Sequence, residues 1–320
     1  MVSVIIPNYN HSGFLKERID SVLKQTYQDF ELIILDDCST DNSREIIEQY
    51  RGNEKVSNII YNKSNGGSVF KQWEKGIAMA AGEYIWIAES DDAADFGFLQ
   101  MMIEFIENDD RIGLVYSDSK IIKSKVDTGK RFSTWKNEVF ETSRWSEIFV
   151  NDGVSEITDF LWKSCTVNNA SAVIFRKKAL IEANPFDLRF KFIGDWYCYL
   201  KICKLYKIGY IGKPLNFYRE HDNNTSIKLY NDMNYVLEYF MLYNWISKSF
   251  PQINKKKLQG NLISYLSHSL LRGWSKSKLL VYYKMFRINP RLFFSTIKGL
   301  TVAIIKSRMG KFRKPYMENK

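Results

Sequence analysis

Short apolar segments alternate with amphipathic segments along the first 120 residues of the chain. The apolar segments have the length of buried strands and cover residues 2–6, 31–35, 57–61, 84–88 and 112–116. Between them, the spacing of apolar side chains predicts helices over 11–26, 40–50 and 66–82. Strands and helices that alternate with short gaps are typical of βαβ units. We therefore expect an α/β fold whose mostly parallel sheet carries helices on both faces.

The pattern weakens between residues 124 and 165, which are polar and rich in aromatic side chains. It returns as a strand and a helix over 170–183, a helix over 194–206, and a strand with its exit loop over 208–221. Beyond Asn223 the pattern is helical and basic. We therefore expect an α/β domain over 1–225 and a helical region over 226–320.

Composition narrows the class of protein further. A chain of 320 residues with 45% hydrophobic content can bury a large core in one or two domains. Met1 leads directly into a strand that ends at Pro7, unlike a signal peptide, and no apolar segment approaches the roughly 20 residues that span a bilayer. The four cysteines form no C-x-x-C pair, and the three histidines stand too far apart in sequence for a His-rich metal site. These features predict a cytoplasmic protein with reduced thiols.

The net charge of +10 comes entirely from the C-terminal quarter of the chain. Residues 239–320 hold 17 Lys or Arg and a single acid, Glu318, for a charge of +16. The first 238 residues hold 29 bases and 35 acids, for a charge of −6. A basic segment attached to a mildly acidic body indicates an anionic partner, either phospholipid headgroups or nucleic acid.

Unusual polar residues follow four of the predicted strands, in the segments PNYN, DDCSTD, ESDD and REHDNNTS. Ligands of open parallel sheets bind at the carboxyl ends of the strands, so these segments predict one binding site. The turn after the first strand, PNYNHSG, has no G-x-G-x-x-G sequence. Its absence counts against a Rossmann dehydrogenase and against a nucleotidyltransferase, which normally carries a Gly-rich loop there.

Glu89, Asp91 and Asp92 stand together where the strand 84–88 ends. Adjacent carboxylates repel one another and resist burial, and a divalent cation that also binds substrate phosphates would stabilise them. The alternative is a solvated group at the positive end of the next helix. Asp36 and Asp37 present the same choice between turn residues and acceptors for a base or ribose. The four similar strand ends favour the ligand-binding interpretation.

Long segments of the chain resemble the family-2 glycosyltransferases of the GT-A fold. They are, in order, VSVIIPNYNHSGFLKERIDSVLKQTYQDFELIILDDCSTDNS, GIAMAAGEYIWIAESDDA, GDWYCYLKI and FYREHDNNTS. These enzymes move a sugar from a nucleotide-diphosphate donor to a hydroxyl acceptor with inversion at the anomeric carbon. The resemblance implies a GT-A catalytic domain over 1–225, with a nucleotide-sugar-binding half (1–120) and an acceptor-binding half (121–225). It also implies a role in assembling a surface polysaccharide or a lipid-linked oligosaccharide.

The resemblance assigns one set of residues to nucleotide-sugar binding, with a UDP-sugar as the expected donor: Pro7, Tyr9, Asp37, Lys71, Glu89, Ser90 and Asp92. Pro7 and Tyr9 would line the nucleobase pocket, and Asp37 would accept a hydrogen bond from the base. Glu89-Ser90-Asp91 takes the place of the family's D-x-D motif, with Glu89 near the ribose or metal and Asp92 ordering the loop. The segment KQWEKG departs from relatives that carry an Arg-Asn pair, which makes Lys71 a candidate for the missing positive charge.

The same resemblance implies that Asp91 and His221 bind the metal, Mn²⁺ or Mg²⁺, and that Asp195 is the catalytic base. A helix N-cap is the alternative role for Asp195, and a structural role is the alternative for His221. Trp196 would shape the acceptor side by stacking on a sugar ring. The expected acceptor is a glycan or a lipid-linked glycan.

Residues 278–314 mix bulky apolar and aromatic side chains with Lys and Arg. This mixture is typical of interfacial helices, so an anionic membrane surface, at the inner face of the cell membrane, is one expected partner. Packing of the segment on the catalytic domain is the alternative. No nucleic-acid-binding module accompanies the charge, so we expect no nucleic-acid partner. The rival interpretation of the whole chain is a catalytically silent, sugar-binding or partner subunit of a glycosyltransferase complex.

Overall fold

The computed structural model of the chain describes residues 1–123, 126–221, 234–270 and 276–308. Contacts divide the chain into two compact units. Unit 1 comprises Met1–Leu161, Cys165–Leu188 and Gly194–Asp222, and unit 2 comprises Trp162–Ser164, Arg189–Ile193 and Asn223–Lys320. Two short segments that precede Asn223 in sequence therefore belong to unit 2. The part of the motif REHDNNTS after His221 lies outside the described residues.

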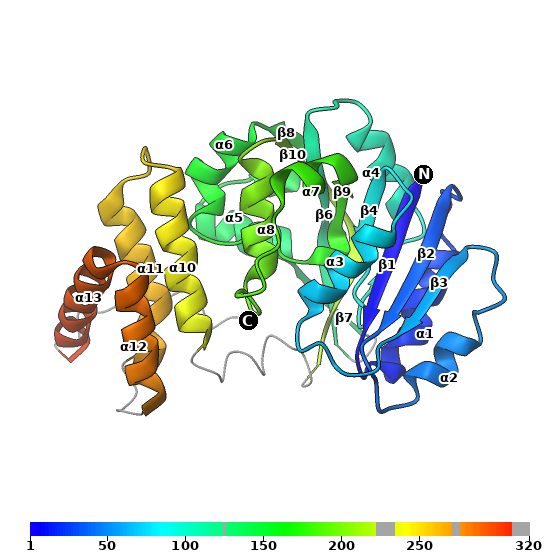
Figure 1. Cartoon of the computed structure of the whole chain (residues 1–320). Coiled ribbons are helices and arrows are strands. Elements are labelled where there is room, and N and C mark those ends of the chain that lie inside the picture. The colour runs from blue at the N-terminus through cyan, green and yellow to red at the C-terminus, as the bar shows by residue number, and fades with distance from the viewer. Residues whose placement is uncertain (124–125, 222–233, 271–275, 309–320) are drawn as a thin grey trace. The chain divides into compact units, whose positions relative to one another are not determined.

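Unit 1 is built on one ten-stranded sheet, whose order is β3-β2-β1-β4-β9-β6-β10-β5, with β7 beside β6 and β8 beside β10 (Figure 1). The strands are β1 (Val2–Asn8), β2 (Phe30–Asp36), β3 (Val56–Tyr61), β4 (Tyr84–Ile87), β5 (Ala93–Ala94), β6 (Ile112–Lys123), β7 (Val126–Arg131), β8 (Phe149–Asn151), β9 (Val173–Arg176) and β10 (Lys207–Glu220). The first four strands pair with one another in parallel, whereas β9 runs antiparallel to both β4 and β6. The α/β class is therefore confirmed, with an antiparallel strand in the middle of the sheet.

The helices of unit 1 connect and cover these strands. They are α1 (Ser12–Leu23), α2 (Ser43–Glu48), α3 (Val69–Met79), α4 (Phe98–Ile106), α5 (Phe132–Phe140), α6 (Gly153–Glu156), α7 (Lys177–Ala183) and α8 (Gly194–Cys203), with short turns η1 (Arg144–Ser146), η2 (Ile157–Leu161) and η3 (Ala170–Ala172). The stretch 124–165, where the sequence pattern is weak, contains the short elements from β7 to η2.

Helices pack on both faces of β1, as its fully buried sequence predicts. Val2, Val4 and Ile6 belong to the same buried cluster as apolar residues of α1 and α4. Ile5 points to the opposite face because side chains alternate along a strand. There it meets α3 so closely that a Cβ on Gly76 would lie 2.5 Å from the Ile5 side chain.

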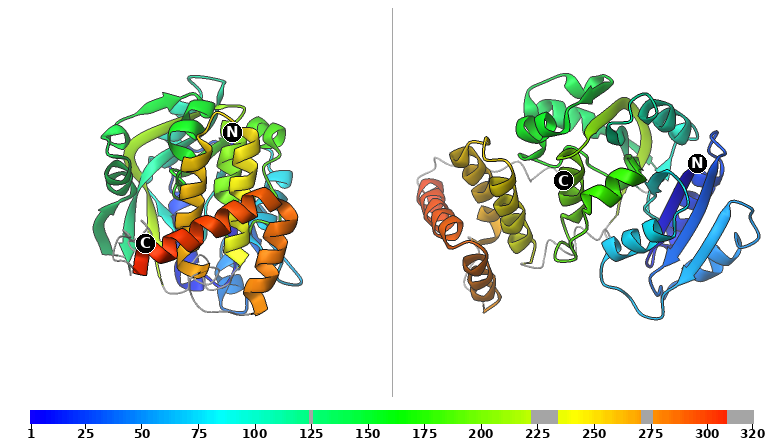
Figure 2. Two further views of the ribbon diagram at one scale, coloured as in Figure 1. Left: turned by 90° about the vertical axis from the view of Figure 1, so that its left-hand side faces the viewer. Right: turned by 45° about the horizontal axis from the view of Figure 1, so that its top comes forward.

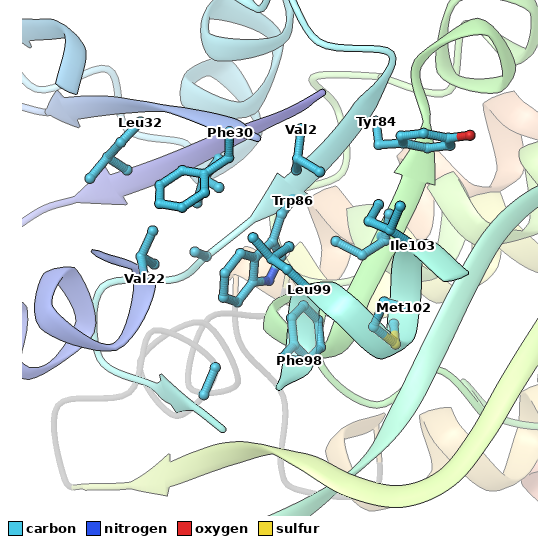
Figure 3. Packing of buried hydrophobic residues seen from close by; sticks show 14 of the residues in the cluster. Val2, Val22, Phe30, Leu32, Tyr84, Trp86, Phe98, Leu99, Met102 and Ile103 are labelled. Atoms are coloured by element: carbon cyan, nitrogen blue, oxygen red, sulfur yellow. The ribbon is translucent and has the colours of Figure 1, made fainter. Parts of the chain in front are cut away.

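Large side chains from β4 and α4 fill the cluster between α1, α4 and the sheet (Figure 3). The rings of Trp86 and Phe98 stack with their centroids 4.5 Å apart. Val2, Leu99 and Met102 are fully buried around them. This packing fixes β4 against α4, and it thereby holds the intervening segment 88–97 at the end of the sheet.

Gly82 lets the entry to β4 approach the start of β1. A Cβ at this position would lie 2.6 Å from the backbone nitrogen of Ser3. The Gly82 amide instead donates to the Ser3 hydroxyl at 2.8 Å. The predicted helix end at Gly82 is therefore three residues late, since α3 ends at Met79, and the glycine serves the strand contact.

Unit 2 is mainly helical. Its long helices are α10 (Asn234–Ser249), α11 (Lys255–Leu270), α12 (Lys276–Ile288) and α13 (Pro290–Arg308). Helix α10 packs on α11 and α12, and α13 packs on α11 and α12. Figure 2 (left) shows α13, in red, running obliquely in front of the other helices of unit 2. Among the described residues, no helix is both long and apolar enough to cross a bilayer.

Candidate functional site

The polar segments that follow β1, β2 and β4 meet at one edge of the sheet. Strand β1 pairs in parallel with both neighbours, with Asn8 opposite Asp36 and Ile5 opposite Ile87. The carboxyl ends of the three strands therefore lie side by side, which is where open α/β sheets bind ligands.

Asp37 joins the end of β2 to the loop before α3. Its Oδ1 accepts hydrogen bonds from Asn62 Nδ2 at 2.6 Å, the Gly66 amide at 2.9 Å and Gln72 Nε2 at 2.9 Å. The exposed Lys71 donates from Nζ to the Gly66 carbonyl at 2.9 Å. Asp37 thus organises the loop, and Lys71 stabilises the same turn from outside.

The end of β1 presents an aromatic ring beside this loop. Pro7 is buried, whereas Tyr9 is 46% exposed. Asn8 Nδ2 donates to Asp36 Oδ1 at 2.9 Å, which anchors the end of β1 to the end of β2. Asn10 then turns the chain with a φ of 57°. The Tyr9 ring is accessible to a planar ligand at the site.

Asp92 holds together three separate parts of the sequence. Its Oδ2 accepts from Asn169 Nδ2 at 2.8 Å, and its Oδ1 accepts from the Arg219 amide at 2.9 Å. Burial and the neighbouring charge of Asp91 raise the pKa of Asp92 to about 6. Both carboxylate oxygens of Asp92 therefore bind protein groups.

Two buried arginines donate hydrogen bonds to the backbone of the acidic segment, residues 89–92. Arg18 Nε, from α1, donates to the Glu89 carbonyl at 2.9 Å. Arg219 Nε, from β10, donates to the Asp91 carbonyl at 2.8 Å. Desolvation lowers the pKa of Arg18 to about 10, against the attraction of the neighbouring acids. The guanidinium charges therefore offset part of the repulsion among the carboxylates.

His11, Asp91 and His221 form a group of possible metal ligands, whose donor atoms all lie within 4.8 Å of one another. His221 Nε2 lies 3.1 Å from Asp91 Oδ2, and the two imidazole centroids are 5.6 Å apart. The interpretation of the histidines as too scattered was therefore wrong for this pair. Two imidazole nitrogens and one carboxylate oxygen fit a divalent cation of borderline softness.

Ser90 orients one of these imidazoles. Its Oγ lies 2.8 Å from His11 Nδ1. A hydrogen bond at one ring nitrogen commonly fixes which nitrogen faces a metal. Since Ser90 engages Nδ1, a metal bound by this imidazole would be held through Nε2.

The carboxyl group of Asp91 is electrostatically distinct from its neighbours. Burial works to raise its pKa, but the hydrogen bond with His221 and the charges of His11 and His221 hold the pKa below its usual value. Asp91 is therefore the carboxylate of the segment that carries negative charge most readily.

Glu89 has the opposite character. Burial, followed by repulsion from Asp91, raises its pKa to about 8 although Trp73 Nε1 donates to its Oε1 at 2.8 Å. The indole of Trp73, in the segment KQWEKG, therefore binds the first acid of the acidic segment.

Asp195 stands in the first turn of α8, within the same unit. Gly194 packs so closely on Phe70 that a Cβ there would lie 2.5 Å from the Phe70 ring. Phe70 in turn contacts Trp73, with ring centroids 5.0 Å apart, and Trp73 binds Glu89. This chain of contacts brings the start of α8 to the acidic segment. Asp195 is half-buried and lies within the helix, so it is not the N-cap residue.

Trp196 does not fit the acceptor role predicted for it. The side chain is 2% exposed, and its Nε1 donates to the Leu161 carbonyl at 2.8 Å. Its ring is therefore enclosed by protein, and α8 packs against η2, the turn that contains Leu161. Stacking of this indole on a sugar is incompatible with the structure, and the corrected role is packing that fixes the start of α8.

The sequence model of Glycosyl transferase family 2 matches residues 3–180. This is more than half of the chain, and the protein belongs to this family. Glycosyltransferase GlyG of Streptococcus pneumoniae is 34% identical over 110 residues, which is 34% of this chain and 36% of GlyG. The matched segment thus spans about a third of that relative.

A second similar protein is TarS of Staphylococcus aureus, a poly(ribitol-phosphate) beta-N-acetylglucosaminyltransferase, 33% identical over 132 residues, or 40% of this chain and 22% of TarS. The crystal structure of TarS residues 1–349 with UDP superposes with a TM-score of 0.69 at 16% identity, over 97% of this chain and 92% of that one. Mannosyltransferase PcManGT of Pyrobaculum calidifontis, in complex with GDP-Man and Mn²⁺, gives 0.56 at 15% identity, over 97% and 88%. These likenesses confirm the GT-A fold.

Sequence reasoning missed three contributors to the site: His11, Arg18 and Arg219. His11 directly follows the PNYN segment, and this position was the available signal. The arginines lie in a helix and a strand, where a charged residue in the sequence is ordinarily expected at the surface. Their burial follows only from the tertiary structure.

Proposed function

We propose that the protein is a metal-dependent inverting glycosyltransferase that moves a sugar from a nucleotide-diphosphate sugar to a hydroxyl acceptor. The observation that carries this proposal is the convergence of His11, Asp91 and His221 at the sheet edge that also holds Tyr9 and Asp37. A cation-binding group beside an aromatic ring and a buried carboxylate suits a nucleoside diphosphate, which combines a base with charged phosphates.

The proposed donor is a UDP-sugar. Pro7 and Tyr9 line the nucleobase pocket, and Asp37 accepts a hydrogen bond from the base. The similar TarS structure contains UDP, which supports this nucleotide. Lys71, Glu89 and Ser90 belong to the surrounding wall, where Lys71 and Ser90 act by holding the loop and His11 in position.

The proposed ion is Mn²⁺ or Mg²⁺, held by Asp91 and His221, with His11 as an added ligand. The mixed nitrogen and oxygen donors favour Mn²⁺, because Mg²⁺ prefers oxygen ligands throughout. PcManGT was crystallised with Mn²⁺, which agrees with this preference. When bound, the cation supplies positive charge that stabilises a departing diphosphate.

Asp195 is the proposed catalytic base. It accepts the proton of the acceptor hydroxyl as that oxygen bonds to the anomeric carbon from the face opposite the diphosphate. The bond between the anomeric carbon and the diphosphate oxygen breaks, and the nucleoside diphosphate leaves with the electron pair. One displacement inverts the anomeric carbon. The closeness of α8 to the acidic segment supports this assignment.

The proposed acceptor is a glycan or lipid-linked glycan in the assembly of a surface polysaccharide. TarS, which acts on poly(ribitol-phosphate), supports a surface polymer as the general class. An anionic membrane at the cytoplasmic side is the second proposed partner, supported by the charge of +16 over residues 239–320. The rival function, a silent binding subunit, would retain nucleotide binding without turnover.

The test compares nucleotide release from UDP-, GDP-, dTDP- and CMP-sugars with Mn²⁺, with Mg²⁺ and with EDTA. We expect release from one donor class that EDTA abolishes and that Asp91→Asn and Asp195→Asn each reduce by at least about 100-fold. The exposed Asp110→Asn is the matched control and should retain native activity.

Calorimetry with the same nucleotides separates the two functions. Asp195→Asn should bind donor as the native protein does, whereas Asp91→Asn should lose the metal-dependent part of binding. Nucleotide binding with no transfer to any glycan acceptor and no hydrolysis would favour the silent subunit, and no binding at all would refute both functions.

A further inference from the structure

The described surface of unit 2 carries its exposed apolar side chains on α12 and α13. Four of the large exposed ones lie on α12 and two on α13: Leu279, Leu280, Tyr283, Phe286, Phe294 and Val302. Tyr283 is 59% exposed and Phe294 is 62% exposed. Helices α10 and α11 contribute no large apolar residue to the exposed set of their described side chains.

On α12 these side chains form one stripe along the helix. Leu279 and Tyr283 are four positions apart, and Leu280, Tyr283 and Phe286 follow at intervals of three, so all four point to the same side. Val281 and Met285 point to the other side and are buried. The buried residues attach the helix to the bundle, so the exposed stripe takes little part in the packing of unit 2.

The stripe continues onto α13. The rings of Phe286 and Phe294 are in edge-to-face contact, with centroids 5.8 Å apart. Phe294, Lys298 and Val302 then recur at intervals of four along α13. The exposed apolar side chains of the two helices therefore lie along one face, which Lys298 interrupts on α13. Figure 2 colours α12 orange and α13 red.

Cations surround this face. Lys284, Arg287, Arg291 and Lys298 are all exposed on the same two helices. Neither helix contains a single Asp or Glu. An apolar, aromatic strip lined with cations and free of acids matches the boundary of an anionic bilayer, where rings enter the headgroup region and Lys and Arg meet lipid phosphates.

We propose that the α12–α13 face, defined by these six apolar side chains and four cations, docks the protein on an anionic lipid bilayer. A second copy of the chain is a poorer occupant, because a symmetric contact would bring the four cations of each copy against one another. This inference gives the proposed membrane partner a surface, but it does not depend on glycosyl transfer.

The test is flotation of the full-length protein with vesicles of phosphatidylcholine alone or with 30% phosphatidylglycerol, at low and high salt. We expect binding only to the anionic vesicles and release at high salt. Lys284→Gln with Arg287→Gln and Lys298→Gln should weaken the partition coefficient by about 100-fold, since each cation near an anionic surface contributes about fivefold.

Two further variants make the result specific to the face. Lys255→Gln with Lys256→Gln and Lys257→Gln removes the same charge from the exposed start of α11, where no large apolar side chain accompanies it, and should retain most binding. Leu280→Gln with Tyr283→Gln and Phe294→Gln keeps all the charge and should still lose at least tenfold. Circular dichroism checks that each variant is folded.

Several outcomes would overturn the inference. The first is an equal loss of binding in the α12–α13 charge variant and in the control variant of α11. The second is native binding by the apolar variant, and the third is no flotation of the folded native protein. Dimers that the apolar variant abolishes, measured by analytical ultracentrifugation without lipid, would make the face a self-association surface. None of these outcomes involves nucleotide release, so a failure to bind lipid would leave the proposed enzymatic function untouched. Conversely, a protein without transferase activity could still bind the membrane.

Discussion

Arg18 and Arg219 donate to carbonyl groups two residues apart in the same acidic segment, one to Glu89 and the other to Asp91. The first arginine comes from α1 and the second from β10, and both are fully or almost fully buried. The segment is therefore held by its backbone, which leaves the Asp91 side chain available to face His11 and His221.

Removal of the Arg18 guanidinium should destabilise the protein. Arg18→Met keeps much of the side-chain volume but leaves the acidic segment 89–92 with one buried guanidinium, that of Arg219, instead of two. Loss of one partner from a buried ionic group costs about 3 kcal/mol or more. Urea unfolding would measure the loss. The exposed Arg51→Met is the control, and an equal destabilisation of both variants would contradict the supporting role.

Metal affinity should depend on the residue that orients His11 as well as on the ligands. Ser90→Ala removes the hydrogen bond to His11 Nδ1, and loss of such a partner typically weakens a metal by 10- to 100-fold. His11→Ala and Asp91→Asn should weaken the affinity for the metal further. Titration of Mn²⁺ followed by electron paramagnetic resonance measures this without substrate. Native affinity in Ser90→Ala and His11→Ala, with loss only in Asp91→Asn, would exclude His11 as a ligand; Glu54→Gln controls for an exposed carboxylate.

The exposed ring of Tyr9 should contribute to nucleotide affinity and little to stability. Stacking on a base is worth about 1–3 kcal/mol, so Tyr9→Ala should weaken UDP binding by at least about fivefold. Tyr9→Phe keeps the ring and should bind normally. Calorimetry with UDP and Mn²⁺ measures both. Equal weakening by the two variants would assign the effect to the hydroxyl rather than to the ring face.

Burial of Lys136 should make the stability of the protein depend on pH. The side chain is 1% exposed, its Nζ donates to the Thr166 carbonyl at 3.3 Å, and it lies 4.8 Å from the Tyr210 ring and 4.9 Å from the Tyr116 ring. Burial lowers the pKa of this lysine to about 7 from 10.5. Between those values the unfolded chain holds the proton and the folded protein does not, so stability rises with pH.

The measurement compares the native protein with Lys136→Met by chemical unfolding at several pH values. Between pH 7 and 9, the unfolding free energy of the native protein should increase relative to that of Lys136→Met by up to about 1.4 kcal/mol per pH unit. A constant difference over this range would indicate that the aromatic rings keep the ammonium charged in the folded state.

The first half of the catalytic fold could be predicted from sequence because its strands are buried on both faces. β1 and β2 are apolar almost throughout, and their burial leaves a clear pattern. β7 could not be found in this way: all six of its residues are exposed, so no alternation of apolar and polar side chains marks it. The buried Lys136 of α5 likewise breaks the rule that charged side chains face solvent.

The candidate site divides in the same manner. Asp37 and Asp91 follow strands with strong patterns, so their meeting at one edge could be expected. His221 and Arg219 reach that edge through the pairing of β10 with β6, which spans about a hundred residues of sequence and includes register shifts. Periodicity carries no information on such pairings. Trp196 shows the opposite error, because residue type suggested a sugar contact where packing against η2 decides its place.

The position of β10 in the chain has a consequence for the order of assembly. The segment 89–92 is synthesised early, but Arg219 and His221, which hold and complete it, follow more than 120 residues later. A nascent chain that lacks β10 therefore carries three crowded carboxylates without their second guanidinium or second imidazole. The group of possible metal ligands cannot be complete before residue 221 has been made, so it forms in the last stage of folding of unit 1.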